Sequence, residues 1–222
     1  MECLICRNQI QNNIKFTSLF FMYQDEVYLC DECRDQFEPI RSKHCPSCYK
    51  SGIDEVCQDC LYWQKRGKEV NHRALYTYNQ AMKQYFSAYK FQGDYLLRKV
   101  FSPIIRKVLV AYKGYTIVPI PLSNESFQKR KFNQVTGFLD ATALTYCNLL
   151  KISRQGKPTQ SSKTREERLK AEQFFVIDST KKIPEKVLLV DDIYTTGATM
   201  ILAKDLLVES GVKIVKTFSL AR

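Results

Sequence analysis

The stretch VLLVDDIYTTGATM, from Val187 to Met200, decides the fold of this chain. Its four leading apolar residues are typical of a strand that is buried on both faces, as in parallel sheets covered by helices. The adjacent acidic residues Asp191 and Asp192 follow at once. Neighbouring side chains of a strand point to opposite faces, so two carboxylates that reach one ligand must lie where the strand has ended. Because ligands of such sheets bind at that end, we expect a ligand site there.

The segment after the acidic pair has the composition of an anion-binding loop. It contains Thr195, Thr196, Gly197, Ala198 and Thr199, and it leads into an apolar helical pattern. Backbone N–H groups at the start of a helix attract anions, glycine allows close backbone approach, and threonine hydroxyls add donors. The two carboxylates can accept hydrogen bonds from vicinal hydroxyls or approach a hard cation. A ribose phosphate fits both halves of the stretch.

Strand and helix patterns alternate along the rest of the chain, which predicts an α/β fold with a parallel sheet covered on both faces. The expected strands are residues 73–78, 115–122, 186–190 and 212–221. The expected helices are residues 79–91, 95–112, 133–150 and 198–210, with Pro103 kinking or dividing the second. Residues 61–72 are polar and are interpreted as a linker. We therefore place a small cysteine-rich domain at residues 1–62 and a larger domain at residues 63–222.

Eight of the nine cysteines lie in the first 60 residues and form four Cys-x-x-Cys pairs. The pairs are Cys3 with Cys6, Cys30 with Cys33, Cys45 with Cys48, and Cys57 with Cys60. Two pairs complete a tetrahedral four-thiolate site, so four pairs predict two structural metal sites with no open position. The ribbon-like spacing favours zinc over an iron–sulfur cluster.

The partners of the four pairs are not fixed by the count alone. Sequential pairing, with a hairpin at residues 16–30 inside the first site, is favoured over an interleaved arrangement. His44 adjoins Cys45 and is interpreted as a surface histidine, because eight thiolates already complete two sites. Cys147 falls in an expected helix and is interpreted as a small buried residue.

The charge is unevenly distributed along the chain. Residues 1–60 carry 6 Lys/Arg and 10 Asp/Glu, whereas residues 61–222 carry 28 and 13. The basic second part suits phosphate-bearing partners, although a solvated cationic surface has the same composition. The N-terminus does not have the pattern of a secretory signal, and its apolar run falls short of the roughly 20 residues of a membrane helix. We expect a cytoplasmic protein without a transmembrane segment.

The stretch from Val187 to Met200 resembles the phosphoribosyl diphosphate (PRPP) signature of type I phosphoribosyltransferases. The resemblance implies that Asp191 and Asp192 are the catalytic pair on the ribose hydroxyls, and that Thr195 to Thr199 hold the 5′-phosphate of magnesium-bound PRPP. The strand at residues 115–122 resembles the one before the family's pyrophosphate loop. The basic loop at residues 157–170 corresponds to the mobile hood, where the predicted pyrophosphate contacts are Lys163, Arg165 and Arg168. A solvated charged loop is the alternative for these three.

Over nearly its full length the chain resembles the ComF family. The resemblance rests on the four cysteine pairs, on YKFQGD (residues 89–94), on VPIPLSNESFQKRKFNQV (residues 118–135), and on the PRPP motif. In the third of these segments Lys131 stands where the family has glycine, which puts the local turn in question. The basic run of Lys129, Arg130 and Lys131 is predicted to contact pyrophosphate or DNA phosphate, with a plain solvated run as the alternative.

The ComF resemblance implies a role in natural transformation. The protein would handle incoming single-stranded DNA beside the uptake ATPase and recombination mediator proteins, in the cytoplasm and recruited to the membrane-associated uptake machinery. Two functions stay open, a nucleic-acid-binding adaptor and an active PRPP-dependent phosphoribosyltransferase whose acceptor the sequence does not name. The aromatic residues of 85–91 are expected either to stack on bases beside Lys83 and Lys90 or, as is more usual for such a stripe, to form core.

Overall fold

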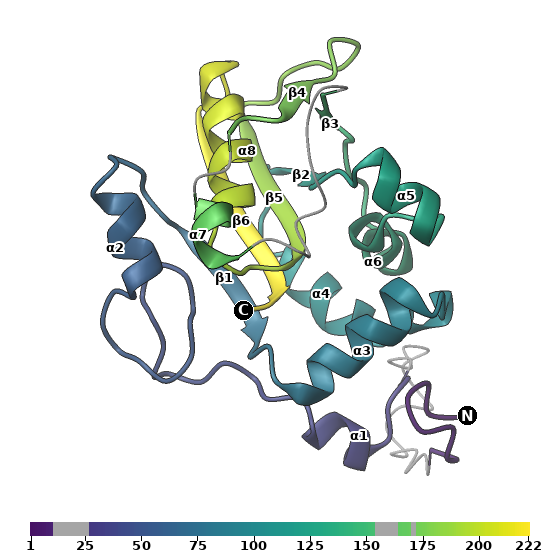
Figure 1. Ribbon diagram of the computed structural model, residues 1–222. Helices are drawn as coiled ribbons and strands as arrows, with labels where there is room; N and C mark the ends of the chain where they lie inside the picture. Colours follow the sequence, from purple (N-terminus) through teal and green to yellow (C-terminus); the bar gives the residue numbers. More distant parts are fainter. Residues whose placement is uncertain (11–26, 154–163, 170–171) are drawn as a thin grey trace.

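A parallel sheet forms the centre of the chain in a computed structural model (Figure 1). The structure describes residues 1–10, 27–153, 164–169 and 172–222. The sheet has the strand order β1-β6-β5-β2, and every neighbouring pair is parallel. Its strands are β1 (His72–Tyr76), β2 (Thr116–Pro119), β5 (Lys186–Ile193) and β6 (Ile214–Ala221). The predicted parallel α/β fold is confirmed, with the apolar stretch before Asp191 as a central strand.

The side chains of the central strand β5 contribute to two hydrophobic cores, one on each face of the sheet. Leu188 and Val190 pack on one side with residues of the helices α3 (Gln80–Phe91), α4 (Ser102–Leu109) and α6 (Gln134–Thr142). Val187 and Leu189 pack on the other side with α8 (Ala198–Glu209). Successive strand side chains point to opposite faces, so a strand covered on both sides must be apolar at every position. Burying each such side chain stabilises the fold by about 1.5–3 kcal/mol.

Helix α3 carries the aromatic stripe, and most of that stripe is core. Asn79 caps the helix by accepting a hydrogen bond from the Met82 backbone N–H at 3.0 Å. Tyr85, Phe86 and Tyr89 are almost fully buried, whereas Phe91 is 69% exposed. The core interpretation therefore holds for three of the four aromatic residues, and only Phe91 presents its ring to solvent.

The segment after α3 divides at Pro103, as expected. A 3₁₀ helix, η2 (Tyr95–Lys99), precedes α4, and Pro103 lies in the first turn of α4, where its missing N–H costs nothing. After β2, the short helix α5 (Asn124–Arg130) begins at Ser123, whose hydroxyl accepts from the Ser126 N–H.

The expected helix at residues 133–150 is wrong in its second half. Helix α6 ends at Thr142, and Ala143 adopts a left-handed conformation with φ of 54°. The Thr142 hydroxyl donates to the Leu139 carbonyl and accepts from the Leu144 N–H, which closes the last turn. Cys147 follows in the connecting segment, partly exposed, so its interpretation as a buried helical residue is also wrong.

A second small sheet lies beyond α6 and was not expected from the sequence. Its strands β3 (Leu150–Ile152) and β4 (Phe175–Ile177) pair antiparallel. Residues 154–163, which contain half of the predicted hood, lie outside the described residues between these strands. The short helix α7 (Arg165–Leu169) follows, inside the segment interpreted as a loop.

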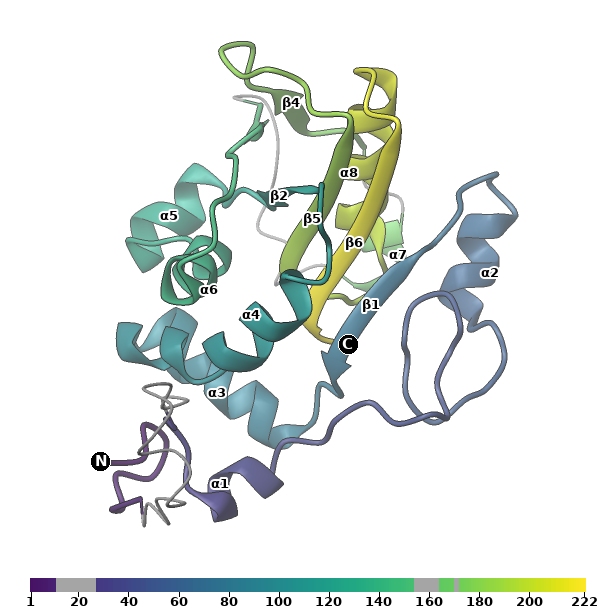
Figure 2. The ribbon, with the colours of Figure 1, turned by 180° about the vertical axis from the view of Figure 1, so that it is seen from behind.

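The segment interpreted as a linker begins as a helix. Helix α2 (Gln58–Gln64) starts directly after Cys57, just as α1 (Asp31–Asp35) starts after Cys30. Trp63 of α2 is buried in the core that contains Leu189, so residues 61–64 are not a linker. Figures 1 and 2 show α1 next to α3, and α2 beside α7 and β1. The expected hairpin at residues 16–30 falls mostly outside the described residues.

Candidate functional site

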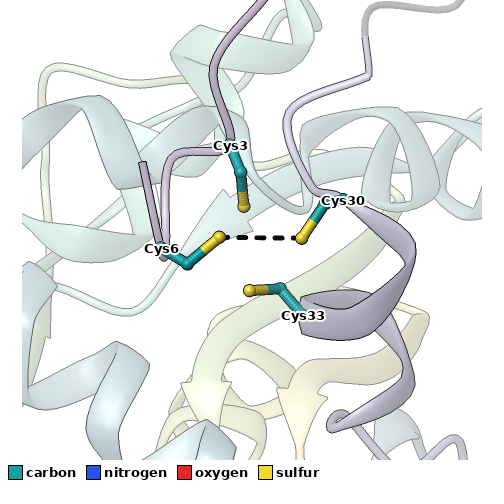
Figure 3. Close-up of side chains that lie close together, drawn as sticks. All are labelled: Cys3, Cys6, Cys30 and Cys33. Carbon is teal, nitrogen blue, oxygen red and sulfur yellow. Dashed lines mark hydrogen bonds between the residues drawn. The ribbon is translucent and has the colours of Figure 1, made fainter. Parts of the chain in front are cut away.

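The eight N-terminal cysteines form two clusters that follow chain order. One cluster contains Cys3, Cys6, Cys30 and Cys33, and the other contains Cys45, Cys48, Cys57 and Cys60. Within each cluster all four sulfur atoms lie within 4.8 Å of one another, and Figure 3 shows the thiols of the first cluster pointing toward a common centre. Sequential pairing is confirmed, and the interleaved arrangement is excluded. Four convergent thiols fit a tetrahedral metal ion, consistent with zinc.

The carboxylate pair lies at the carboxyl end of β5, as predicted, but inside the strand. Because β5 continues to Ile193, the prediction that the strand ends before Asp191 is wrong by three residues. The Asp192 N–H donates to Asp191 Oδ1, and the Ile193 N–H donates to Asp192 Oδ1, both at 2.8 Å. Asp192 is buried and Asp191 is partly buried. Burial and the negative charge of Asp192 raise the pKa of Asp191 well above its usual range. Two like charges at one strand end therefore need cations around them.

Lys90 of α3 supplies one such cation, and sequence reasoning gave it only a stacking role. Its Nζ forms an ion pair with Asp192 Oδ2, and only 11% of the Lys90 side chain is exposed. Burial alone would raise the pKa of Asp192, but the Lys90 ammonium outweighs it and lowers the pKa below the usual range. Asp192 is therefore a carboxylate at neutral pH. The sequence signal was the position of Lys90 inside the segment YKFQGD.

A pocket of about 480 Å³ opens beside the carboxylate pair. Helix α3, the segment from β2 to α5, and the end of β5 with the start of α8 form its walls. Its polar lining includes Lys83, Lys90, Arg130, Asp191, Asp192, Thr195 and Thr199. The structure thus brings the predicted carboxylates, two of the predicted loop threonines and one residue of the basic run to one cavity.

Arg130 is the member of the basic run that lines this pocket. Its Nη1 donates to Gln134 Oε1 at 3.0 Å, and its guanidinium lies 5.2 Å from the centre of the Phe91 ring. Burial lowers the pKa of Arg130 while the charges of Asp192 and Asp191 raise it, so these carboxylates act on the guanidinium. Lys129 and Lys131 are exposed, and Lys129 pairs with Glu125.

The predicted phosphate loop connects β5 to α8. Gly197 is the N-cap of α8 and has φ of 86°, a left-handed conformation that glycine adopts without steric cost. A Cβ at this position would also clash with the hydroxyl of Tyr194. Thr195 is exposed, whereas Thr196 and Ala198 are buried. The glycine is therefore required by the conformation and packing of the loop itself, a reason that the sequence did not supply. Its predicted role in close approach to a ligand stays a prediction.

Comparisons with known proteins assign this architecture. A model of the phosphoribosyl transferase domain matches residues 98–222. The chain is 48% identical to the competence protein ComFC of Streptococcus pneumoniae (strain ATCC BAA-255 / R6), over 100% of both chains. It is 34% identical to the competence protein ComFC of Bacillus subtilis (strain 168), over 99% of this chain and 94% of that one. The chain belongs to the ComFC family.

One departure from the ComF pattern now has a physical account. Lys131, where the family has glycine, is the C-cap of α5 and has φ of 65°, the left-handed conformation that a glycine would adopt. The turn is kept, and the lysine bears a strain of about 1–2 kcal/mol. The doubt about the local turn is resolved, because the backbone N–H of Lys131 still closes the helix on the Phe127 carbonyl at 2.7 Å.

The predicted hood residues of this ComFC-family chain have separate outcomes. Lys163 lies outside the described residues, and for Arg168 the structure describes only its place on α7. Arg165 points to the second cysteine cluster, where its Nε donates to Asp59 Oδ1 at 2.9 Å. Its contact with pyrophosphate stays a prediction. No helix within the described part of the chain is long and apolar enough to cross a membrane.

Proposed function

We propose that this ComFC-family chain binds magnesium-bound PRPP, or a closely related ribose phosphate, and acts in the uptake and processing of transforming single-stranded DNA. The observation that carries the proposal is the single pocket that joins Asp191 and Asp192 to Thr195, Thr199 and three cationic side chains. Carboxylates suit the ribose hydroxyls, and the loop at the start of α8 suits a phosphate.

Each part of the proposed ligand has a matching part of the pocket. Asp191 and Asp192 accept the ribose hydroxyls, and residues 195–199 bind the 5′-phosphate with backbone N–H groups and hydroxyls. Arg130 and Lys83 face the diphosphate, where an arginine fork binds phosphate oxygens in pairs. Magnesium, when bound with PRPP, neutralises part of the diphosphate charge. The segment with Lys163, Arg165 and Arg168 is proposed to add cations when the ligand is present.

The cysteine clusters are proposed to hold two structural zinc ions. All eight thiols converge in two groups of four, which leaves no coordination position for water or substrate. A structural zinc site stabilises a small domain by about 10–16 kcal/mol at neutral pH. The clusters therefore support the fold, and the chemistry belongs to the pocket at the end of β5.

Single-stranded DNA is the proposed macromolecular ligand. Two exposed aromatic side chains have arginine partners: Arg130 lies 5.2 Å from the ring centre of Phe91, which lines the pocket, and Arg98 lies 3.9 Å from the ring centre of Tyr95. Bases stack on aromatic rings while cations bind the backbone phosphates. The proposed protein partners are the competence uptake ATPase and recombination mediator proteins, met in the cytoplasm at the membrane-associated uptake machinery.

Catalysis of phosphoribosyl transfer is a second candidate function, and the lining of the pocket favours it. Tyr78, Phe86 and Phe91 line the pocket together with the carboxylate pair, which gives an acceptor an aromatic surface to pack against. Diphosphate would leave C1 of the ribose with its bonding electrons, and an acceptor atom would form the new bond to C1. Release of diphosphate from PRPP only when an acceptor is present would establish this activity.

Ligand-induced thermal stabilisation tests the PRPP site. Magnesium and PRPP together should raise the Tm of the metal-loaded chain, and Asp191→Asn with Asp192→Asn should abolish the rise. The matched control is Glu185→Gln with Glu209→Gln, two exposed carboxylates at the start of β5 and the far end of α8, which should keep it. No rise in the unmutated chain would overturn the proposed PRPP site.

Salt dependence tests the DNA proposal. Replacing Lys129, Arg130 and Lys131 by glutamine should lower single-strand affinity and flatten the plot of log K against log salt by about 2, at about 0.7 per phosphate contact. The control replaces Lys181, Lys182 and Lys186, three exposed lysines at the opposite end of β5, and should leave the slope unchanged. Equal slopes for both triple variants would rule out the basic run as the DNA contact.

A further inference from the structure

The second cysteine cluster lies directly against the phosphate loop. Three structural parts meet here, namely the cluster with helix α2, the side chain of Arg222, and the loop from Tyr194 to Gly197. All four cysteines of this cluster are buried, in the same core as Tyr194 and Trp63. The contacts between these parts are directed hydrogen bonds as well as apolar packing.

Arg222 connects the cluster to the loop with one guanidinium group. Its Nε and Nη2 both lie 3.4 Å from Cys48 Sγ, and its Nη2 lies 3.3 Å from Asp59 Oδ2 of α2. Its Nη1 donates to the Thr195 carbonyl at 2.5 Å. Only 8% of the side chain is exposed. A buried arginine needs anionic partners, and thiolates that bind a metal supply that charge.

Trp63 holds the next peptide of the loop. Its indole Nε1 donates to the Thr196 carbonyl at 2.8 Å. In a trans peptide the N–H points opposite to the C=O. Contacts to the carbonyls of Thr195 and Thr196 therefore turn the N–H groups of Thr196 and Gly197 away from the cluster. These two N–H groups belong to the loop that is proposed to bind the 5′-phosphate.

Tyr194 packs the start of the loop against residues near the second cluster. Its ring lies 4.0 Å from the ring of His72 and 5.0 Å from the Arg222 guanidinium. The His72 N–H donates to the Ser47 carbonyl, which lies between two cysteines of the cluster. The Tyr194 hydroxyl occupies the space that a Cβ on Gly197 would need, so the ring packs directly against the loop backbone. The loop is thus enclosed by residues whose positions depend on the cluster.

We propose that the second cysteine cluster, when it holds its metal, positions the phosphate loop through Arg222 and Trp63, so that ribose-phosphate binding depends on that metal. Metal loss frees Cys48, Cys57 and Cys60, and with them the anchor of Arg222 and the start of α2. The identity of the ligand rests on the proposed function, whereas the positioning of the loop does not. Oxidation or chelation of this cluster, but not of the first, lowers ligand affinity.

Two variants test the positioning with the metal still in place. Trp63→Phe removes the indole N–H but keeps an aromatic ring, and PRPP affinity should fall about tenfold because the Thr196 carbonyl loses a buried donor. Arg222→Met should lower it by about 10- to 100-fold, as expected for hydrogen bonds from a charged donor. Arg222→Lys should restore part of the affinity. Both zinc ions, measured by a colorimetric chelator after denaturation, should remain.

A pair of cysteine variants tests the dependence on metal. Cys45→Ser lies in the second cluster without contacting Arg222 and should lose one zinc ion per chain together with most of the PRPP affinity. Cys6→Ser in the first cluster should also lose one zinc ion but change the affinity less than about threefold, within the range of a surface change. The probe is magnesium with PRPP, followed by calorimetry.

Hydrogen exchange of residues 194–199 separates this proposal from the proposed function. Faster exchange in Trp63→Phe, Arg222→Met and Cys45→Ser, but not in Cys6→Ser, supports the coupling even if the unmutated chain binds no PRPP. If exchange and affinity in Trp63→Phe and Arg222→Met equal those of the unmutated chain, the proposal is overturned. Equal protection of the loop in a folded Cys45→Ser chain that has lost one zinc ion overturns it as well.

Discussion

The two cysteine clusters use the same four ligands, yet they contact the rest of the molecule in different ways. In the first cluster Cys6 is exposed and Cys30 is partly exposed, whereas all four cysteines of the second are buried. Cys3 and Cys33 join the apolar core behind α3, together with Phe37. The second cluster contacts the phosphate loop through Arg222 and Trp63.

Apolar contacts and hydrogen bonds have different effects on a binding site. Apolar packing has no direction, so it can press a helix into place but cannot orient a single peptide. Hydrogen bonds have direction, so a guanidinium and an indole can set which way two carbonyls point. The first cluster supports α3, the wall that carries Lys90, mainly through apolar packing. The directed contacts of its segments lie at the two ends of α3, where Asn79 Nδ2 donates to the Gln36 carbonyl and Arg7 pairs with Asp94. The second cluster contacts the loop on the other side of the pocket and orients its carbonyls.

Removing a metal ligand from each cluster should give the largest effects and show what the clusters share. Cys33→Ser and Cys60→Ser should each lose one zinc ion and lower the free energy of unfolding by more than about 5 kcal/mol. Zinc content and urea unfolding measure both quantities. Variants that keep two zinc ions per chain would contradict the assignment of these residues as metal ligands.

Phe37→Ala should distinguish the roles of the two clusters, because it should lower the stability of the fold without lowering PRPP affinity. It packs edge-on against Phe101 at 5.0 Å and against Tyr85 at 6.3 Å between ring centres. Phe37→Ala should lower the free energy of unfolding by about 3–5 kcal/mol, because it leaves a cavity in the core. Titration of the folded variant with PRPP should give nearly the affinity of the unmutated chain. If Phe37→Ala lowered PRPP affinity as much as Arg222→Met, the two clusters would not have the different roles described here.

Lys90 lies on α3, the pocket wall that the first cluster supports, and its substitution tests the role of that wall. In Lys90→Met the ammonium no longer opposes the effect of burial, so the pKa of Asp192 should rise. The pair then keeps a proton to higher pH, so PRPP affinity should fall more at pH 6 than at pH 8. Arg130 is the other cation near the pair, and Tyr78, Tyr85 and Tyr89 are the neutral groups that sense Asp192.

Lys83→Met is the matched control, since Lys83 lines the same pocket from the same helix. It should weaken binding by the same factor at both pH values.

In the unmutated chain the pKa of Asp192 lies below its unfolded value, so the ion pair stabilises the fold above about pH 4 and that contribution is lost as the pH falls. Identical pH profiles for Lys90→Met and the unmutated chain would exclude this role.

Lys131→Gly should have the smallest effect, because it lies in a turn that α5 closes by itself. Glycine adopts a φ of 65° without strain but loses more chain entropy on folding, so the net gain in stability should be about 0.5–1 kcal/mol. Thermal unfolding measures it. Single-strand affinity should fall slightly through the loss of one charge. A destabilised variant would mean that the lysine side chain makes a contact that outweighs its strain.

Sequence reasoning predicted the parts of the molecule that are local in the chain. Three patterns depend on only a few neighbouring residues each and indicate their local structure directly. They are the apolar run before Asp191, the glycine of the phosphate loop and the two-residue spacing of the cysteines. Sequential pairing of the clusters followed from loop length. The helix after Asn133 was overextended because Leu144, Leu149 and Leu150 continue the apolar pattern without a glycine or proline to mark the end at Thr142.

The contacts that build the site could not be read from spacing. Arg222 lies 174 positions from Cys48, and Trp63 lies 133 positions from Thr196. Trp63 stands in a polar segment, so its burial depends on a core that only the folded chain creates. Lys90 was named as a stacking neighbour because its helix pattern was visible, while its ion pair with Asp192 required the position of α3 relative to β5.

A crystal structure of the metal-loaded chain with magnesium and PRPP tests the central claim most directly. We expect ribose hydroxyls on Asp191 and Asp192, the 5′-phosphate on the N–H groups of residues 195–199, and Arg222 and Trp63 still bound to the Thr195 and Thr196 carbonyls. PRPP bound elsewhere on the chain, or bound at the end of β5 with those two carbonyls released from the second cluster, would contradict it.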